Sequence, residues 1–405
     1  MAGGPHGLLL MFEGLPQTVI DSQVFAGVRW LSHEGIANFD ILSFACTDAA
    51  LAESRGRARE IESQFERRLI LQRGERPAMP WAMQVNRKRL EAFLKGAPDR
   101  YTFMHARTDY AAAVAGPVAR RFAIPLIWDC RGDGEAEFRE RVGRSPAGRL
   151  ISAVAGLRYQ AQGRAAARYA GRAVFVTEYL MRKWTPHLQQ KPAHVIPCLA
   201  DEGRFWFDPD LGDRTRRSLG WAGEHLVLIY SGSLQFYQGF DHAMTTFAEI
   251  AGLNPMARLL VLTPSVTEAR DRLKAAAIDE ATVVHARFDE MNGYLNAADC
   301  AIMLRPPLDM NLAAFPTKFA EFGMTGLPVL MNDAVPDCHK VAAAAGNLIE
   351  PGPVGDLLAR LDDFMGRGDA FRRSLAAHYR RCLTRPHFRD VFTEIYAPAV
   401  ENNAG

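Results

Sequence analysis

The segment FPTKFAEFGMTGLPVL, residues 315–330, places a proline, a threonine, a lysine and a glutamate within an otherwise apolar stretch. Pro316 favours the first position of a helix, where its missing N–H is not needed, and Gly326 favours the helix end. A strand is expected from Pro328 onward. The segment is therefore predicted to form a short helix that is followed directly by a buried strand.

The amino end of this helix carries groups that suit an anionic ligand. The amides of Thr317 and Lys318 are expected to point outward at the positive end of the helix dipole, where a phosphate binds well. Glu321 shares a face with both residues, and one turn further on its carboxylate can accept hydrogen bonds from sugar hydroxyls. This arrangement suits the diphosphate and ribose of a nucleotide. The alternative is an ordinary lysine–glutamate pair on a solvated face.

On both sides of this segment, short apolar runs alternate with amphipathic helical patterns. This alternation is typical of βαβ units, in which helices cover both faces of parallel sheets, so we predict an α/β protein. The predicted strands are residues 8–12, 39–45, 101–106, 124–129, 173–177, 225–232, 257–263, 281–286, 300–305 and 327–332.

Two series of such units flank residues 194–214, which are rich in Pro, Gly and Asp and are predicted to connect two domains. We place the boundary near residue 200, which agrees with a chain of 405 residues and roughly 150 residues per domain. Neither half has a G-x-G-x-x-G motif after its first strand, so the sequence disfavours dinucleotide binding.

The composition narrows the class of protein further. The formal net charge of +2 is too small for bulk nucleic-acid binding. Six scattered cysteines without a C-x-x-C pair argue against a disulfide framework or a thiolate zinc site, and the histidines and carboxylates show no metal-ligand spacing. The sequence shows no signal peptide and no apolar run of roughly 20 residues, so we expect a cytoplasmic protein.

Residues 316–330 resemble the nucleotide-sugar motif of retaining GT-B glycosyltransferases of family 4, in which a P-T-K-x-x-E-like helix precedes a G-x-P-V strand. Other segments similar to this family follow in the family's order along most of the chain. They are LPQTVIDSQV (15–24), HAR (105–107), WDCRGD (128–133), VIPCLADEGRF (195–205) and YSGSLQFYQGFD (230–241).

The resemblance implies a GT-B fold, with two Rossmann-like βαβ domains that face each other across a cleft. Residues 1–199 would bind the acceptor and residues 200–385 the nucleotide sugar. An amphipathic helix within residues 386–405 would pack back on the N-terminal domain. The implied activity is sugar transfer from a UDP- or GDP-sugar to a glycan or lipid-linked acceptor in surface polysaccharide or glycan biosynthesis, without a metal or other cofactor.

The resemblance also supplies donor-binding candidates. The helix that starts near Thr317 and Lys318 would hold the diphosphate, and Glu321 would hold the ribose. Arg305 ends a predicted strand, where its guanidinium can grip phosphate oxygens or, alternatively, lie in solvent. Gly232 and Ser233 follow the first strand of the second half, where a slim backbone lets phosphate approach or simply makes a tight turn.

Two departures from the family pattern concern this donor site. The family has a second glutamate eight positions before the ribose-binding one, and Ala313 stands there in this chain. The loop SLQFYQG (233–239) is uncharged, with Gln238 near the usual lysine position. Positive charge for the diphosphate must then come from Lys318 and Arg305, or the protein is a weakened enzyme.

The acceptor site is predicted in the first half. Asp129 and Arg131 follow an apolar strand, and Asp129 would accept a hydrogen bond from an acceptor hydroxyl while Arg131 orients an anionic group. The alternative is a local Asp129–Arg131 ion pair that shapes the loop. Arg107 is a further acceptor-binding candidate, and His105 is expected to be a satisfied histidine at a strand end.

The family reaction retains the anomeric configuration, with front-face attack and proton transfer to the departing diphosphate. Asp129, Arg131 and Lys318 are the candidate catalytic residues, acting through positioning and charge stabilisation. Two alternatives stay open. One is a non-catalytic module that binds nucleotide sugars or glycans, and the other is a nucleotide-sugar epimerase.

Residues 141–172 contain seven arginines and no acidic residue. A basic amphipathic helix of this kind can lie on an anionic bilayer, here the inner face of the cell membrane. The alternative is a basic face that remains in solvent.

Overall fold

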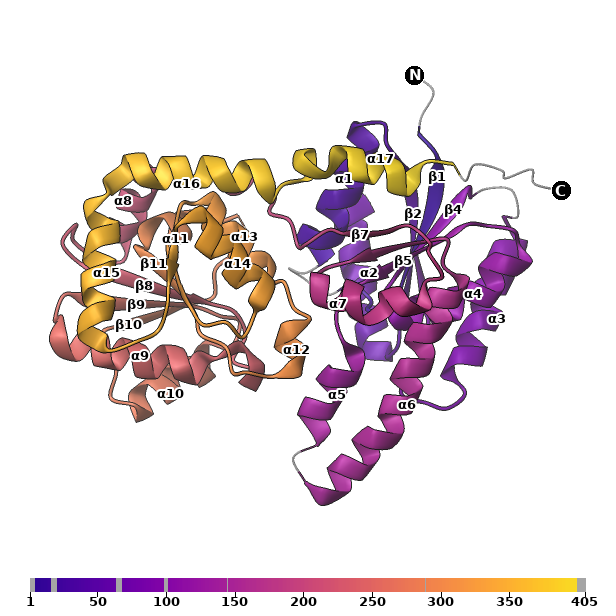
Figure 1. The fold of residues 1–405 in the computed structure, drawn as a ribbon, viewed down its shortest axis with the longest axis horizontal. Helices are drawn as coiled ribbons and strands as arrows, with labels where there is room; N and C mark the ends of the chain where they lie inside the picture. The colour runs from indigo at the N-terminus through magenta and orange to yellow at the C-terminus, as the bar shows by residue number, and fades with distance from the viewer. Residues whose placement is uncertain are drawn as a thin grey trace. The chain divides into compact units, whose positions relative to one another are not determined.

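The computed structural model of the protein describes residues 4–15, 20–62, 68–97, 101–143, 145–287 and 289–398. The chain divides into two compact units, unit 1 (Met1–Pro197 with Phe388–Gly405) and unit 2 (Cys198–His387) (Figure 1). Each unit contains one sheet in which every pairing is parallel. The predicted α/β class is therefore confirmed. Residues 16–19 of the family-like segment 15–24, and residues 399–405 of the predicted terminal helix, lie outside the described residues.

Unit 1 has a seven-stranded sheet in the order β3-β2-β1-β4-β5-β6-β7. Its strands are β1 (His6–Met11), β2 (Asn38–Ala45), β3 (Leu69–Arg73), β4 (Phe103–Arg107), β5 (Leu126–Cys130), β6 (Arg172–Phe175) and β7 (Ala193–Val195). Its helices are α1 (Ala26–His33), α2 (Asp48–Glu62), α3 (Ala82–Lys95), α4 (Asp109–Arg121), α5 (Gly134–Val142), α6 (Pro146–Tyr169), α7 (Glu178–Trp184) and α17 (Arg389–Tyr396), with a π-helical turn at Asp21–Phe25.

Unit 2 has a six-stranded sheet in the order β10-β9-β8-β11-β12-β13. Its strands are β8 (Leu226–Ser231), β9 (Ala257–Leu262), β10 (Ala281–Val284), β11 (Cys300–Met303), β12 (Val329–Met331) and β13 (Leu348–Ile349). Its helices are α8 (Pro209–Ser218), α9 (Phe240–Leu253), α10 (Val266–Ala275), α11 (Met291–Ala297), α12 (Asp309–Leu312), α13 (Thr317–Met324), α14 (Pro336–Ala345), α15 (Val354–Gly366) and α16 (Gly368–Cys382).

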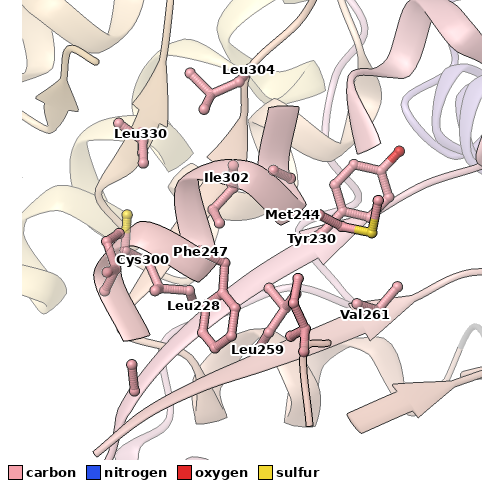
Figure 2. Close-up of a cluster of buried hydrophobic side chains, with 14 of the residues drawn as sticks. Leu228, Tyr230, Met244, Phe247, Leu259, Val261, Cys300, Ile302, Leu304 and Leu330 are labelled. Atoms are coloured by element: carbon pink, nitrogen blue, oxygen red, sulfur yellow. The ribbon is translucent and has the colours of Figure 1, made fainter. Parts of the chain in front are cut away.

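All ten predicted strands are present, and each end lies within two residues of its predicted position. The three strands that were not predicted, β3, β7 and β13, lie at edges of the two sheets. The core of unit 2 forms where side chains from β8, β9 and β11 meet α9, as Figure 2 shows around Phe247, Leu228 and Ile302. Strands buried on both faces explain why these segments are continuous apolar runs.

The last helix of the chain belongs to unit 1. Tyr396 of α17 packs its ring against Phe39 of β2 and Phe103 of β4, with 5.3 Å between ring centroids in each case. Arg172 donates hydrogen bonds to the carbonyls of Ile395 and Ala397, at 3.0 and 2.7 Å. The C-terminal segment thus covers one face of the first sheet.

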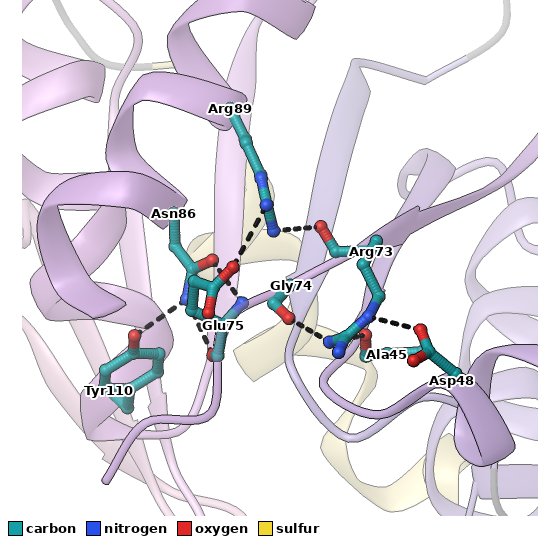
Figure 3. A network of polar contacts seen from close by, with 8 residues as sticks. All are labelled: Ala45, Asp48, Arg73, Gly74, Glu75, Asn86, Arg89 and Tyr110. Carbon is teal, nitrogen blue, oxygen red and sulfur yellow. Dashed lines mark hydrogen bonds and ion pairs between the residues drawn. The ribbon is translucent and has the colours of Figure 1, made fainter. Parts of the chain in front are cut away.

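A polar network holds the loop that follows β3 (Figure 3). The amide side chain of Asn86, fully buried in α3, accepts from the backbone N–H of Glu75 and donates to its carbonyl, at 2.9 and 3.1 Å. Asn86 also donates to the Tyr110 hydroxyl at 2.9 Å. Arg89 contacts the Glu75 carboxylate at 3.1 Å and the Arg73 carbonyl. These bonds fix the loop on α3 and α4.

Helix α13 differs slightly from its prediction. The helix begins at Thr317, and Pro316 precedes it with an extended backbone (φ −65°, ψ 130°). Pro316 is therefore the N-cap and not the first helical residue; its carbonyl accepts a hydrogen bond from Phe319 at 3.0 Å. The expected stop is present, since Gly326 has a φ of +69°, which favours glycine.

Gly323 lets α13 pack closely on α16. A Cβ atom at this position would lie 1.9 Å from Cδ1 of Tyr379, whose hydroxyl donates to the buried Asn347 at 3.0 Å. We predict that Gly323→Ala lowers the free energy of unfolding by about 1–3 kcal/mol, because the methyl group overpacks this contact.

Urea unfolding of the full chain measures this effect. Gly252→Ala in α9 is the matched control, since a Cβ there meets nothing within 4 Å. Gly252→Ala should leave stability unchanged or slightly higher. Equal stability of the two variants would show that the α13–α16 contact does not constrain the helix.

Candidate functional site

The predicted donor-site residues gather at one point of the unit 2 sheet. Strands β8 and β11 are neighbours, but the chain continues from β8 to β9 on one side and from β11 to β12 on the other. In open α/β sheets, ligands bind at the carboxyl ends of strands beside such a switch point. Gly232 follows β8 there, and Arg305 follows β11.

Gly232 leaves room for a cationic group. Its φ is +147°, and a Cβ atom would lie 2.6 Å from Nζ of Lys318. Gly239, at the end of the same turn, has a φ of +78°, and a Cβ there would lie 1.7 Å from the carbonyl oxygen of Leu304. The turn after β8 therefore packs tightly against the end of β11. Ser233 contributes its carbonyl, which accepts a hydrogen bond from the Tyr230 hydroxyl at 2.7 Å.

Lys318, the second residue of α13, reaches back to the turn after β8. Its ammonium group donates to the carbonyl of Ser231 at 2.6 Å and to Oε1 of Gln238 at 2.8 Å. It lies 5.4 Å from the centre of the Tyr230 ring. Thr317, predicted to bind the diphosphate, precedes it as the first residue of the helix.

Arg305 meets Lys318 at the same oxygen atom. Its side chain is 3% exposed, and it donates to Oε1 of Gln238 at 2.9 Å and to Oδ1 of Asn311 at 3.1 Å. Its Nε atom is buried without a hydrogen-bond partner among the described residues. Asn332 fixes the backbone, accepting from the Arg305 N–H at 3.2 Å and donating to its carbonyl at 2.7 Å.

Positive charge at this point is not neutralised by the described part of the chain. Lys318 and Arg305 share a neutral amide oxygen, and neither forms an ion pair with a described carboxylate. Burial, reinforced by Arg305, holds the pKa of Lys318 well below its ordinary value, and burial also lowers the pKa of Arg305. Because two cations in a poorly solvated site repel each other, the arrangement favours an anion.

Glu321 lies one turn along α13 from this pair. It is 8% exposed and forms no ion pair with Lys318, so the two residues are not an ordinary pair on a solvated face. Burial raises the pKa of Glu321 to about 7; Lys318 opposes this rise and Asp201 adds to it. Its carboxylate has no hydrogen-bond partner among the described residues and can accept hydroxyl donors. Ala313, where the family has its other glutamate, is fully buried.

In unit 1, the predicted acceptor residues also lie together. Asp129 at the end of β5 is buried, with 3.5 Å between its Oδ1 and the Arg131 guanidinium. Its Oδ2 lies 3.4 Å from Nε2 of His105 and 3.8 Å from the Arg107 guanidinium. Burial alone would raise the pKa of Asp129, but Arg131, His105 and Arg107 outweigh it and hold the pKa well below its ordinary value. The carboxylate therefore stays ionised.

Residues that the sequence analysis did not identify complete this cluster. Arg107 donates to Glu13 at 3.1 Å and to Gln23 at 2.8 Å, and Arg131 contacts the same Gln23 oxygen at 3.4 Å. Glu13 follows β1 and Arg107 ends β4, the two strands at the switch point of this sheet. The other nitrogen of His105, Nδ1, meets the Tyr396 hydroxyl at 3.1 Å, as expected for a satisfied histidine.

Gln238 and Asn311 were also missed as parts of the donor-side cluster. Their roles depend on contacts with Arg305, to which Gln238 is linked across 67 positions of sequence. In the sequence, Gln238 is notable only because it is a neutral residue near a position where the family usually has a lysine. Its neutral oxygen is the atom that brings Lys318 and Arg305 together.

No known family model and no curated protein sequence matches the chain. Solved structures do match it. HepE from Anabaena, in complex with UDP, is 13% identical and covers 96% of this chain and 98% of its own, with a TM-score of 0.69. Sucrose-phosphate synthase from Thermosynechococcus elongatus is 14% identical and covers 96% and 97%, with a TM-score of 0.63.

A third match is WaaG, a glycosyltransferase involved in lipopolysaccharide biosynthesis, at 15% identity, 97% coverage of both chains and a TM-score of 0.61. Sequence identities this low establish a common architecture and nothing about substrates. Two Rossmann-like domains, each built on one parallel sheet, together with these matches over nearly the full length, show that the chain has the GT-B fold.

Proposed function

We propose that the protein is a retaining glycosyltransferase, similar to family 4, that transfers a sugar from a UDP- or GDP-sugar to a glycan or lipid-linked acceptor. The observation that carries this proposal is the buried pair Lys318 and Arg305, which meet at one neutral oxygen beside the amino end of α13. A diphosphate supplies the negative charge that this pair lacks.

The donor would lie on unit 2. Its diphosphate would contact Lys318, Arg305 and the amides at Thr317, with Gly232 and Ser233 lining the approach. Its ribose hydroxyls would donate to Glu321, whose carboxylate has no described partner. The HepE structures with UDP, UDP-glucose, and UDP with glucose show nucleotide-sugar binding by a protein of the same fold.

The acceptor would lie on unit 1. Asp129 would accept a hydrogen bond from an acceptor hydroxyl, and Arg107 and Arg131 would bind anionic groups of a glycan or lipid-linked acceptor. Arg131, His105 and Arg107 keep Asp129 ionised, so this carboxylate suits hydrogen-bond acceptance and positioning better than proton donation.

Retention would follow from front-face attack, in which the departing diphosphate takes the proton of the acceptor hydroxyl. The acceptor oxygen would bond to the anomeric carbon of the sugar while the bond between that carbon and the diphosphate oxygen breaks, so that negative charge grows on the leaving diphosphate. Lys318 and Arg305 would stabilise that charge, and their low exposure strengthens the interaction. These two side chains supply the positive charge from the protein itself.

A non-catalytic module that binds nucleotide sugars is the second candidate. It is favoured by the fully buried Ala313 in place of a glutamate and by a turn after β8 that contributes no charged side chain. Thermal-shift measurements with UDP, GDP and their sugars, followed by transfer assays with those that bind, distinguish the two. Binding without turnover across acceptors supports the module, and no shift with any nucleotide overturns both candidates.

Replacing Gln238 by glutamate tests the unpaired charge directly. Gln238→Glu puts a carboxylate between Lys318 and Arg305, so we expect a higher melting temperature without ligand. The same carboxylate competes with the diphosphate for Lys318 and Arg305, so nucleotide affinity should fall. Losing one hydrogen bond to a charged group costs roughly 1.5–3 kcal/mol, which corresponds to a loss of about tenfold to a hundredfold. Calorimetric titration with UDP and GDP measures this loss.

Gln235→Glu is the matched control, because it adds the same charge to an exposed position of the same turn. It should leave affinity within about twofold of the original, as expected for an exposed charge. Equal losses in both variants would indicate a general charge effect and contradict the assignment of the site.

Glu321 also makes stability depend on pH. Below about pH 4.5 the carboxyl is protonated in both the folded and the unfolded chain, so it contributes nothing to the dependence. Between about pH 4.5 and 7 the unfolded chain ionises first, and the folded state loses stability. Above about pH 7 the loss is complete and amounts to about 3 kcal/mol.

We therefore predict that Glu321→Gln is more stable than the original protein above pH 7, and that the gain disappears at low pH. Urea unfolding across this range measures the difference. Glu249→Gln, at an exposed site on α9, should show no such dependence. Glu321→Gln should also weaken nucleotide binding, and an unchanged thermal shift with UDP and GDP would exclude Glu321 from the site.

A further inference from the structure

Helices α5 and α6 form a hairpin that leaves unit 1 after the carboxyl end of β5. The two helices run side by side away from the sheet in Figure 1. They pack closely near the turn, where a Cβ atom on Gly148 would lie 1.9 Å from the carbonyl oxygen of Val142. Of the predicted basic segment, Arg144 lies outside the described residues.

The two halves of α6 differ in how far the rest of unit 1 covers them. In its C-terminal half, Ala166 and Ala167 are fully buried, and a Cβ on Gly163 would lie 2.0 Å from the Trp184 ring. In the N-terminal half, four large apolar side chains are between 54% and 69% exposed. We call them the apolar stripe; they are Leu150, Ile151, Val154 and Leu157.

The stripe occupies one side of the helix, since its members follow the spacing i, i+1, i+4, i+7. Among the described residues of unit 1, only Trp81 is another large apolar side chain with comparable exposure. So concentrated a group of exposed apolar side chains marks an interaction site.

Basic residues continue the same side of the helix. Arg164 follows Leu157 by seven positions, which returns it to the face of the stripe, and Arg168 follows one turn later; both are exposed. Arg149 is exposed beside Leu150, and α6 contains no acidic residue. The apolar stripe is thus flanked by exposed arginines, Arg149 before it and Arg164 and Arg168 after it.

We propose that this hairpin docks on an anionic lipid bilayer, with the apolar stripe in the interface and the arginines on lipid phosphates. Apolar side chains with arginines at either end of the group suit the boundary between the acyl chains and the phosphates of a bilayer. Helices that lie in the interface in this way bury their apolar side by about 5–10 Å. A second copy of the chain or a protein partner would need acidic groups facing those arginines.

The hairpin is held firmly enough to transmit such docking to unit 1. Arg158 of α6 donates to the carbonyls of Ala78 and Met79, at 2.8 and 3.2 Å. These carbonyls belong to the loop that the network of Figure 3 fixes, and the same loop presents Trp81, which is 55% exposed. Tryptophan is favoured at membrane interfaces. Among the described residues, no helix is both long and apolar enough to cross a bilayer, so docking would be peripheral.

Flotation of the full chain with vesicles tests the proposal. We expect binding to phosphatidylcholine vesicles that contain phosphatidylglycerol and none to phosphatidylcholine alone. A stripe variant (Leu150→Gln, Ile151→Gln, Val154→Gln, Leu157→Gln) should abolish binding. An arginine variant (Arg149→Gln, Arg164→Gln, Arg168→Gln) should weaken it about a hundredfold, at roughly fivefold per basic residue near the surface.

The controls make the same kinds of substitution, apolar to Gln and Arg to Gln, at exposed positions of unit 2. Leu253→Gln replaces an apolar side chain that is 60% exposed, and Arg214→Gln, Arg217→Gln and Arg381→Gln remove three exposed arginines; neither change should alter binding. Circular dichroism checks folding, and Leu157→Gln alone serves if the stripe variant misfolds. Absence of binding to anionic vesicles, binding that the stripe variants retain, or a dimer that the stripe variant dissociates without vesicle binding would overturn the proposal.

Membrane docking does not rest on the proposed function, whereas its use to reach a lipid-linked acceptor does. The two are separated by their readouts. A protein that floats with anionic vesicles but gives no thermal shift with nucleotides would retain the docking surface and lose the transferase. The converse result would remove the docking surface and leave nucleotide binding, and with it the proposed function, intact.

Discussion

Two buried cationic side chains that share one neutral oxygen set the chemistry of unit 2. Lys318 arrives from α13 and Arg305 from β11, so the contact at Gln238 exists only when the helix and the sheet are correctly placed. The close packing of Gly232 and Gly239 gives this contact its space. Such an excess of charge is costly in an unliganded protein, and selection for folding alone would supply a carboxylate there.

The cluster of charged residues in unit 1 has a different balance of charge, because it is built around a carboxylate. Beside its switch point a carboxylate, Asp129 of β5, is surrounded by His105, Arg107 and Arg131, and the arginines are further engaged by Glu13 and Gln23. The cluster is nearly balanced in charge and is cross-linked by hydrogen bonds. Under the proposed function, this cluster would recognise hydroxyl groups of the acceptor, and the cationic pair of unit 2 would recognise the charge of the diphosphate.

The sequence was most informative where burial is complete. It was less informative for long-range contacts and at sheet edges, where β10 was the one edge strand predicted among the described residues. The ten strands found as apolar runs have two covered faces or an equally clear apolar pattern. Strands β7 and β13 span only three and two residues, and β3, at a sheet edge, ends in Gln72 and Arg73. Edge strands need fewer apolar side chains, so their signal is weak.

Candidate site residues could likewise be predicted where local structure places them, and not where long-range contacts do. Glu321 and Lys318 were recognisable because one helical turn places them, and their buried environment agrees with a ligand role. The meeting of Lys318 with Arg305 required the strand order β8-β11, which no local pattern encodes. Gln238 is the clearest example, because a glutamine in a turn carries no signal until its two partners are known.

Tyr396 has a consequence for the order in which the protein is assembled during synthesis. Its ring covers Phe39 and Phe103, and its hydroxyl meets His105, 291 positions earlier in the chain. While the ribosome is still translating, that face of the first sheet stays uncovered, whereas residues 198–387 are contiguous and can close without waiting. Unit 1 is therefore begun before unit 2 and completed after it, and a truncation that removes Tyr396 would uncover Phe39 and Phe103.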